Sequence, residues 1–151
     1  LDFQGLRVIW LHSNVKDGIN LEQINFLKSK LNKKGYKKAI VFLHHALWAG
    51  DTNYVNSNYD QQSKINWYKD IIPILKEGKV AGVFSGDAGD RSEGTYGKIS
   101  GIPHFITGMS GGEDRFLPEW FTIEIENNEI NFFWNKLFEG IQYIKEINFS
   151  E

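Results

Sequence analysis

Two adjacent histidines, His44 and His45, end one apolar segment of the chain, and two aspartates, Asp87 and Asp90, follow another. Imidazole and carboxylate groups are the ligands available for divalent metal ions when cysteine is absent, and this chain has no cysteine. No Ser-His-Asp spacing stands out that would indicate a serine nucleophile. Metal-assisted hydrolysis is therefore the chemistry that these residue types offer.

His44 is the strongest metal-ligand candidate, because histidines at the carboxyl end of a buried strand lie where α/β proteins place their sites. The alternative is a histidine that only forms structural hydrogen bonds. If the strand continues, His45 points to the opposite side from His44 and faces the substrate or supports the ligand. Asp87 and Asp90 belong to the sequence Ser-Gly-Asp-Ala-Gly-Asp. They are expected to bind metal, although a turn whose aspartates cap backbone N–H groups would have the same composition.

Two further residues could take part in the site beside His45. Arg91 could bind a phosphate or pair with a neighbouring carboxylate, and Trp48 could line a substrate pocket or close over the core. We therefore expect His45, Trp48 and Arg91 to bind substrate. His104 lies inside an expected strand and is interpreted as a hydrogen-bonded core histidine.

The elements that must position these side chains follow from apolar patterning. Short, largely apolar runs, the first of them interrupted by Arg7, predict strands over residues 6–11, 39–43, 79–84 and 102–107. Alternation of apolar and polar residues predicts three antiparallel strands over residues 120–125, 129–134 and 141–147. Residues 85–101 contain many glycines and polar residues and are expected to form a long loop.

Two helices are expected between the first three strands. Asn20 is a predicted N-cap with Gln23 completing a capping box, and Gly35 suits the exit of this helix. The second helix is predicted over residues 60–76, with a kink or restart at Pro73. The fold class is therefore α/β, with a mixed β-sheet, flanking helices and a C-terminal antiparallel meander, and residues 1–151 are expected to form one unit.

Composition and charge limit the classes of function that this chain can have. The chain has 151 residues, of which 41% are hydrophobic, and its net charge is 17 − 19 = −2. This balance does not favour nucleic acid binding. No apolar run reaches the roughly 18 residues of a membrane span, and no signal peptide is evident. The chain starts at Leu1 without methionine, which we interpret as a trimmed product. The compartment stays open.

The order of these motifs resembles the calcineurin-like metallophosphoesterases. Residues 6–14 resemble the family strand that ends in Leu-Asp-Ser/Thr-Asn, and Gln23 with Leu27 resembles its Gln-x-x-x-Leu helix. Residues 41–48 are similar to the family block Val-x-x-His-His-Pro-Leu, with Ala46 in place of proline. Residues 83–86 resemble the approach to the closing Gly-His-x-His motif.

The resemblance covers only the second half of the family domain, so it implies half of an α/β/β/α sandwich. It makes His44 a metal ligand. Where the family has His-x-His, this chain has Asp87-Ala88-Gly89, so Asp87 could replace the first ligand and Asp90 could approximate the second. The early family motifs Asp-x-His and Gly-Asn-His are absent, and Gly86-Asp87 does not fit the early Gly-Asp motif, because the His-His block precedes it and no Gly-Asn-His follows. The resemblance therefore implies an N-terminal half of the same domain as partner and two divalent ions (Mn, Fe, Zn or Mg) in the complete site.

The function implied by the resemblance is metal-dependent hydrolysis of a phosphorylated substrate by the complete site, with this chain inactive by itself. The alternatives are a catalytically inactive phosphoesterase-like binding domain and an unrelated α/β domain with a structural histidine pair. The substrate stays open.

Overall fold

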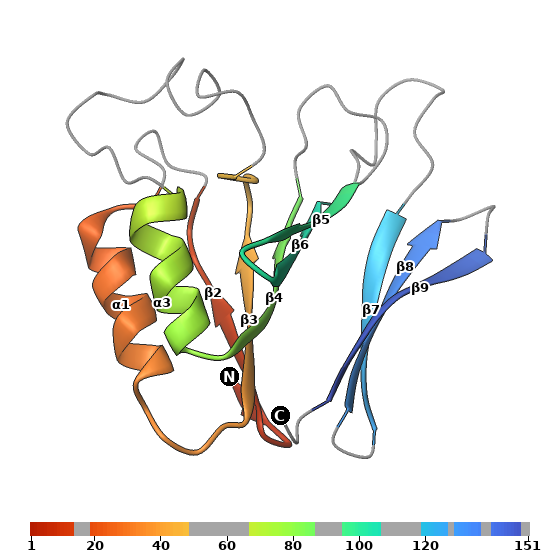
Figure 1. Cartoon of the computed structure of the whole chain (residues 1–151), viewed down its shortest axis with the longest axis horizontal. Coiled ribbons are helices and arrows are strands. Elements are labelled where there is room, and N and C mark those ends of the chain that lie inside the picture. The colour runs from red at the N-terminus through yellow and green to blue at the C-terminus, as the bar shows by residue number, and fades with distance from the viewer. Residues whose placement is uncertain are drawn as a thin grey trace.

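The computed structural model describes residues 1–13, 19–48, 67–86, 95–106, 119–126, 129–136 and 140–148. These residues form three layers: helices, a six-stranded sheet and a three-stranded sheet (Figure 1). The expected α/β fold with flanking helices and a C-terminal antiparallel meander is confirmed. The meander forms a sheet of its own that faces the larger sheet.

The first sheet has the strand order β1-β2-β3-β4-β6-β5. Its strands are β1 (Asp2–Phe3), β2 (Leu6–Trp10), β3 (Lys38–Leu43), β4 (Val80–Ser85), β5 (Thr95–Ile99) and β6 (Ile102–Ile106). The strands β2, β3, β4 and β6 are mutually parallel, whereas β1 and β5 pair antiparallel at the two edges. Because the four parallel strands share one direction, their carboxyl ends meet at one edge of the sheet (Figure 1).

The second sheet is the antiparallel meander β7 (Glu119–Glu126), β8 (Glu129–Lys136) and β9 (Gly140–Asn148). Glu126 and Glu129 are register partners, so the first two predicted antiparallel strands pair with each other. The turn between them lies outside the described residues.

Both helices cover one face of the first sheet (Figure 1). Helix α1 (Leu21–Leu31) begins after Asn20, whose side chain accepts a hydrogen bond from the backbone N–H of Gln23, as expected for an N-cap. It ends at Leu31, so the expected exit at Gly35 was wrong; the backbone N–H of Asn32 closes the last turn on the carbonyl of Lys28.

The second helical segment is described from Trp67 onwards. A π-helical turn (Trp67–Ile71) leads into α3 (Ile72–Glu77), with Pro73 in the first turn of α3. The restart predicted at Pro73 is therefore confirmed, since the first turn of a helix tolerates a missing N–H. Residues 60–66, where the helix was expected to begin, lie outside the described residues.

The core has two parts, one on each face of the first sheet. Between sheet and helices lie residues such as Leu27, Val41, Ile71 and Leu75, all fully buried. Between the two sheets lie aliphatic residues together with a group of phenylalanines, among them Phe84, Phe105 and Phe132. None of the described helices is long and apolar enough to cross a membrane.

The predicted long loop over residues 85–101 is corrected by β5, which pairs with β6 along its whole length. The two strands are joined at Ser100 and Gly101, which both have positive φ (53° and 87°). Such a turn twists in the same sense as the flanking strands and holds them together. The strand therefore forms through pairing with β6, although its own sequence is not an apolar run and includes a glycine and a lysine.

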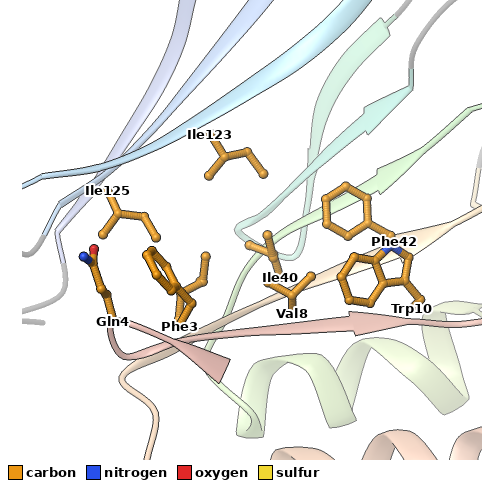
Figure 2. Close-up of a pocket in the computed structure, with 9 residues that line it drawn as sticks. Phe3, Gln4, Val8, Trp10, Ile40, Phe42, Ile123 and Ile125 are labelled. Carbon is orange, nitrogen blue, oxygen red and sulfur yellow. The ribbon is translucent and has the colours of Figure 1, made fainter. Parts of the chain in front are cut away.

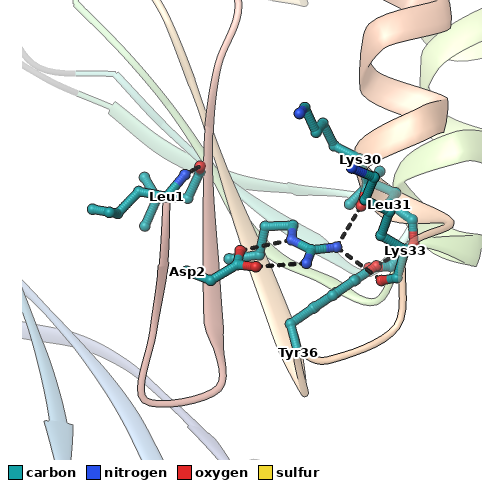
Figure 3. Close-up of polar contacts among 9 residues, drawn as sticks. Leu1, Asp2, Lys30, Leu31, Lys33 and Tyr36 are labelled. Carbon is teal, nitrogen blue, oxygen red and sulfur yellow. Dashed lines mark hydrogen bonds and ion pairs between the residues drawn. The ribbon is translucent and has the colours of Figure 1, made fainter.

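Arg7 interrupts the apolar run of β2, and its side chain is buried. Its guanidinium donates two hydrogen bonds to the carboxylate of Asp2 and two more to the carbonyls of Lys30 and Lys33 at the end of α1 (Figure 3). The hydrogen bond from Arg7 lowers the pKa of Asp2. The guanidinium also lies 4.2 Å from the ring centroid of Tyr36. Arg7 thus fixes β1 and the end of α1 to β2 in one place.

Candidate functional site

The predicted site lies at the carboxyl ends of β2, β3 and β4, which we call the carboxyl edge. Trp10 of β2 is the register partner of Phe42 in β3, and Leu43 at the end of β3 is the partner of Ser85 at the end of β4. The residues that follow each strand therefore start at neighbouring positions. They are His12 and Ser13 after β2, His44 and His45 after β3, and Gly86 after β4.

The hydroxyl of Ser13 holds the histidine pair in place. Its Oγ accepts hydrogen bonds from the backbone N–H groups of both His44 and His45, each at 2.8 Å. Ser13 is 0% exposed, so water does not compete for these bonds. A short turn continues the chain, in which the N–H of Leu47 donates to the carbonyl of His45 at 3.0 Å. The backbone of the histidine pair is therefore fixed to the end of the neighbouring strand.

Gln23 of α1 anchors the strand end that carries Ser13. Its side-chain carbonyl accepts from the backbone N–H of His12 at 2.6 Å, and its amide donates to the carbonyl of His12 at 2.8 Å. In the predicted capping box, the Gln23 side chain would have turned back to its own N-cap. That half of the prediction was wrong, because the side chain replaces a missing backbone partner of His12.

The two imidazole rings lie close together. His44 is exposed and His45 is half-buried, and their ring centroids are 4.5 Å apart with a T-shaped arrangement. His45 was expected on the opposite side from His44, on the condition that the strand continued. That condition is not met, because β3 ends at Leu43 and the turn held by Ser13 brings the two rings close together. The pair therefore presents two imidazoles at the carboxyl edge.

Trp48, the predicted substrate-binding aromatic, packs on a buried aromatic group. Its ring centroid lies 5.3 Å from that of Trp67 and 4.7 Å from that of His104. Its carbonyl accepts a hydrogen bond from the hydroxyl of Tyr68 at 3.2 Å. One side of the indole is thus used for packing, and substrate contact by Trp48 stays a prediction.

His104 is the hydrogen-bonded core histidine that its sequence context predicts. It is 2% exposed, its Nδ1 lies 2.8 Å from the carbonyl of Ile102, and Trp67 donates to its Nε2 at 3.2 Å. These partners require a neutral ring with the proton on Nδ1. Burial lowers the pKa of His104 to about 4. The ring therefore supports the turn region at Trp48 and is not an exposed ligand.

Asp87, Asp90 and Arg91 lie outside the described residues, so their predicted roles stay predictions. Within the described ranges, no three His, Asp or Glu side chains are grouped so as to hold a metal ion. What is established is the placement of His44, and of Gly86, the residue before Asp87, at the ends of adjacent strands.

Ser13 and Gln23 position the histidine pair. Sequence reasoning missed Ser13 and assigned Gln23 only to a capping box. The available signal was weak. A small hydroxyl residue directly after a buried strand, and a glutamine in the first turn of the next helix, are both common outside functional sites.

Comparison with known proteins finds similarity at the level of solved structures. No family model and no curated protein matches this chain. Among solved structures, the chain is similar to a Vps29 single mutant from Entamoeba histolytica, with a TM-score of 0.34 and 13% identity over 94% of this chain and 97% of that one. At this TM-score the two backbones follow only loosely similar paths.

Proposed function

We propose that this chain supplies part of the metal site of a phosphoester hydrolase, with His44 as a metal ligand. The observation that carries the proposal is the geometry of the carboxyl edge. An exposed imidazole stands on a backbone held rigid by two N–H groups that donate hydrogen bonds to one buried hydroxyl, beside the strand that leads to Asp87. Rigid support of this kind is what a metal ligand needs, because the ligand must hold its position when the metal binds.

The donor set on this chain suits a divalent ion of intermediate hardness. His44 would contribute a neutral imidazole, and Asp87 and Asp90 would contribute carboxylate oxygens, a mixture that Mn, Fe, Zn and Mg accept to different degrees. When bound, a pair of such ions activates a water molecule and neutralises the phosphate oxygens. Three donors are too few for two ions. An N-terminal half of the same domain is therefore part of the proposal, in keeping with the motifs that the sequence lacks.

The remaining residues of the carboxyl edge would orient the phosphorylated substrate. His45 lies beside the ligand position and could donate a hydrogen bond to a phosphate oxygen. Arg91 would offer a guanidinium, which matches two phosphate oxygens at once. Trp48 would limit access from the side where it packs on Trp67.

Titration of the chain with Mn²⁺ tests the ligand role directly. We expect the paramagnetic ion to broaden the nuclear magnetic resonance signals of the His44 ring first. In calorimetry, His44→Ala should weaken Mn²⁺ binding about tenfold or more, because even hydrogen-bond partners of ligands contribute about 10- to 100-fold to affinity. His12→Ala is the matched control, since His12 is an exposed histidine at the end of the neighbouring strand. It should leave the affinity within about twofold.

Equal loss in the two variants would mean that Mn²⁺ binds surface histidines without selection, and it would overturn the proposed site. The same result would leave the inactive binding domain as the better description. Asp87→Asn should weaken binding as His44→Ala does, and unchanged affinity in that variant would remove Asp87 from the donor set.

A further inference from the structure

The ends of α1 and α3 and the connections from them to β3 and β4 are rich in lysine. Residues 28–38 contain six lysines and no acidic residue, and residues 76–79 contain two more lysines and one glutamate. We call these eight lysines the lysine end. Six of their side chains are exposed, among them Lys33, Lys34 and Lys79. The lysine end lies at the amino ends of the parallel strands, opposite the carboxyl edge (Figure 1).

Direct contacts join the two lysine-bearing segments into one surface. The hydroxyl of Tyr36 forms hydrogen bonds with the carbonyl of Leu31 at 2.6 Å and with the carbonyl of Gly78 at 3.0 Å. Leu31 and Gly78 also pack closely, since a Cβ added at Gly78 would lie 2.8 Å from the Cβ of Leu31. The lysines that flank these contacts therefore belong to one end of the folded chain, although about 40 residues of sequence separate the two groups.

The small net charge of the chain hides a large separation of charge. The lysine end and Arg7 have nine positive charges, opposed there by Asp2, which binds Arg7, and by Glu77, which gives 9 − 2 = +7. The rest of the sequence has 17 − 9 = 8 basic and 19 − 2 = 17 acidic residues, which gives 8 − 17 = −9. A molecule with this distribution turns its positive end toward a negatively charged surface.

The lysine end is part of the described structure, and its exposure is known. Its lysines lie within residues 19–48 and 67–86. The longest undescribed stretches, residues 14–18, 49–66 and 107–118, each begin just beyond the carboxyl end of a parallel strand. The described residues that lead into them are therefore at the other end of the sheet (Figure 1).

The residue types of the lysine end suit diffuse negative charge better than a single anionic group. A lysine ammonium is a point charge and lacks the planar fork with which arginine pairs two oxygens of one phosphate or carboxylate. Arg7 is buried and donates to Asp2 and to backbone carbonyls. Tyr36 is half-buried and has Arg7 over its ring at 4.2 Å, so it offers no open face on which a nucleic acid base could stack.

An exposed aromatic side chain beside the lysine end favours a lipid surface. Phe3 is 57% exposed and lies next to Gln4 at the turn between β1 and β2 (Figure 2). The carbonyl of Gly5 in this turn accepts a hydrogen bond from the backbone N–H of Lys37 at 2.7 Å. Proteins that bind at the bilayer surface combine basic side chains at the headgroups with apolar side chains that enter the interface. Phe3 and the lysines supply both.

We infer that the lysine end binds the surface of an anionic lipid bilayer and that the carboxyl edge then faces away from the membrane. The six residues of β3 separate the two ends by about 20 Å. This is more than twice the Debye length of about 8 Å at physiological salt, so the membrane charge is screened at the carboxyl edge. The inference does not depend on the proposed metal site, and its test uses no metal.

Sedimentation with lipid vesicles tests this. We expect the chain to bind vesicles of phosphatidylcholine and phosphatidylserine in equal amounts and not to bind phosphatidylcholine alone. Raising the salt from about 0.1 to about 1 M should release the chain, because the Debye length falls from about 10 to about 3 Å. Phe3→Ser should weaken binding and leave its salt dependence unchanged, and the fold should persist because the ring is largely exposed.

Matched lysine variants locate the contact. Lys34→Gln should weaken vesicle binding about fivefold, and Lys33→Gln combined with Lys34→Gln about thirtyfold, the scale set by the contribution of one lysine near an anionic membrane. Lys69→Gln is the control, since Lys69 is exposed on the π-helical turn near the carboxyl edge, and it should change affinity by less than about twofold. Equal loss in Lys34→Gln and Lys69→Gln would overturn the inference.

The orientation and the class of partner have their own readouts. Lipids with paramagnetic headgroups should broaden the backbone amide signals of residues 33–37 and leave those of His44 and His45 sharp. Broadening of the histidine signals first would overturn the inference, as would equal binding to neutral and anionic vesicles. Tighter binding to a DNA duplex or to polyglutamate than to the anionic vesicles at the same salt would overturn it in favour of a nucleic acid or an acidic protein.

Discussion

Replacement of Ser13 by alanine removes the single atom that joins the end of β2 to the histidine pair. The Ser13 Oγ accepts from the backbone N–H groups of His44 and His45, both at 2.8 Å, in a position that is closed to water. The variant loses both bonds and gains no new partner for either donor. The fold itself should persist, because a serine-to-alanine change adds no volume.

The size of the effect follows from these two bonds. A hydrogen bond contributes about 0.5–1.5 kcal/mol net to stability, so losing two should lower the free energy of unfolding by about 2 kcal/mol. Urea unfolding of a domain of this size has a slope of about 1–3 kcal/mol per molar urea. The unfolding midpoint of Ser13→Ala should therefore fall by about 1 M urea with an unchanged slope.

Ser29→Ala is the matched control for this measurement. Its hydroxyl donates to the carbonyl of Phe26 on an exposed turn of α1, and its removal should change stability by less than about 0.5 kcal/mol. Amide exchange of His44 and His45 should become faster in Ser13→Ala and stay unchanged in the control. A Ser13→Ala midpoint equal to that of the control would refute the view that Ser13 fixes the histidine pair.

Three further predictions concern other parts of the fold. Burial lowers the pKa of His104 from 6.5 to about 4, so between pH 6.5 and pH 4 the unfolded chain binds a proton there more readily than the folded chain does. The free energy of unfolding should therefore fall by about 3 kcal/mol as the pH drops through this range. Urea midpoints at pH 7 and pH 4 should differ less in His104→Gln than in the original chain, and equal pH dependence of the two would contradict the assignment. Gln23→Ala breaks both hydrogen bonds to the backbone of His12 and should cost about 1 kcal/mol, or about 2–4 °C in the melting temperature; calorimetry would disprove this if the melting temperature did not move. Gly78→Ala would place a Cβ 2.8 Å from the Cβ of Leu31, so the free energy of unfolding measured in urea should fall by about 1–3 kcal/mol. Gly97→Ala is the control, because a Cβ added at Gly97 meets nothing within 4 Å. Similar losses in the two variants would contradict the packing argument.

The strands of the fold could be predicted where their own residues are apolar. β4 and β6 are buried along their whole length and β2 and β3 over most of theirs, and their largely apolar runs indicated them correctly. β5 could not be found in this way, because Thr95–Ile99 contains glycine and lysine and becomes a strand only through its pairing with β6. Likewise, the two residues of β1 gain their place from Arg7, which binds Asp2 across the hairpin.

The position of the candidate site in the fold could be predicted more reliably than the arrangement of its side chains. His44 lies at the strand end where sequence reasoning placed it. The relation of His45 to His44 could not be predicted, because it depends on a hydroxyl 31 residues earlier in the chain. Local periodicity contains no information on such a contact. The roles of Asp87 and Asp90 remain predictions from residue type and position.

The order of strands in the first sheet has a consequence for folding during synthesis on the ribosome. Each parallel strand pairs with one made before it, so this sheet can assemble in the order of synthesis. The strands that cover the face carrying Phe84 and Phe105 are made afterwards. At about 5–20 residues per second, this face stays exposed for roughly 2–8 seconds after β6 is complete. Exposed apolar surface favours aggregation, so substitutions in β8 that delay closure of this face should lower the yield of folded protein before they measurably lower its stability.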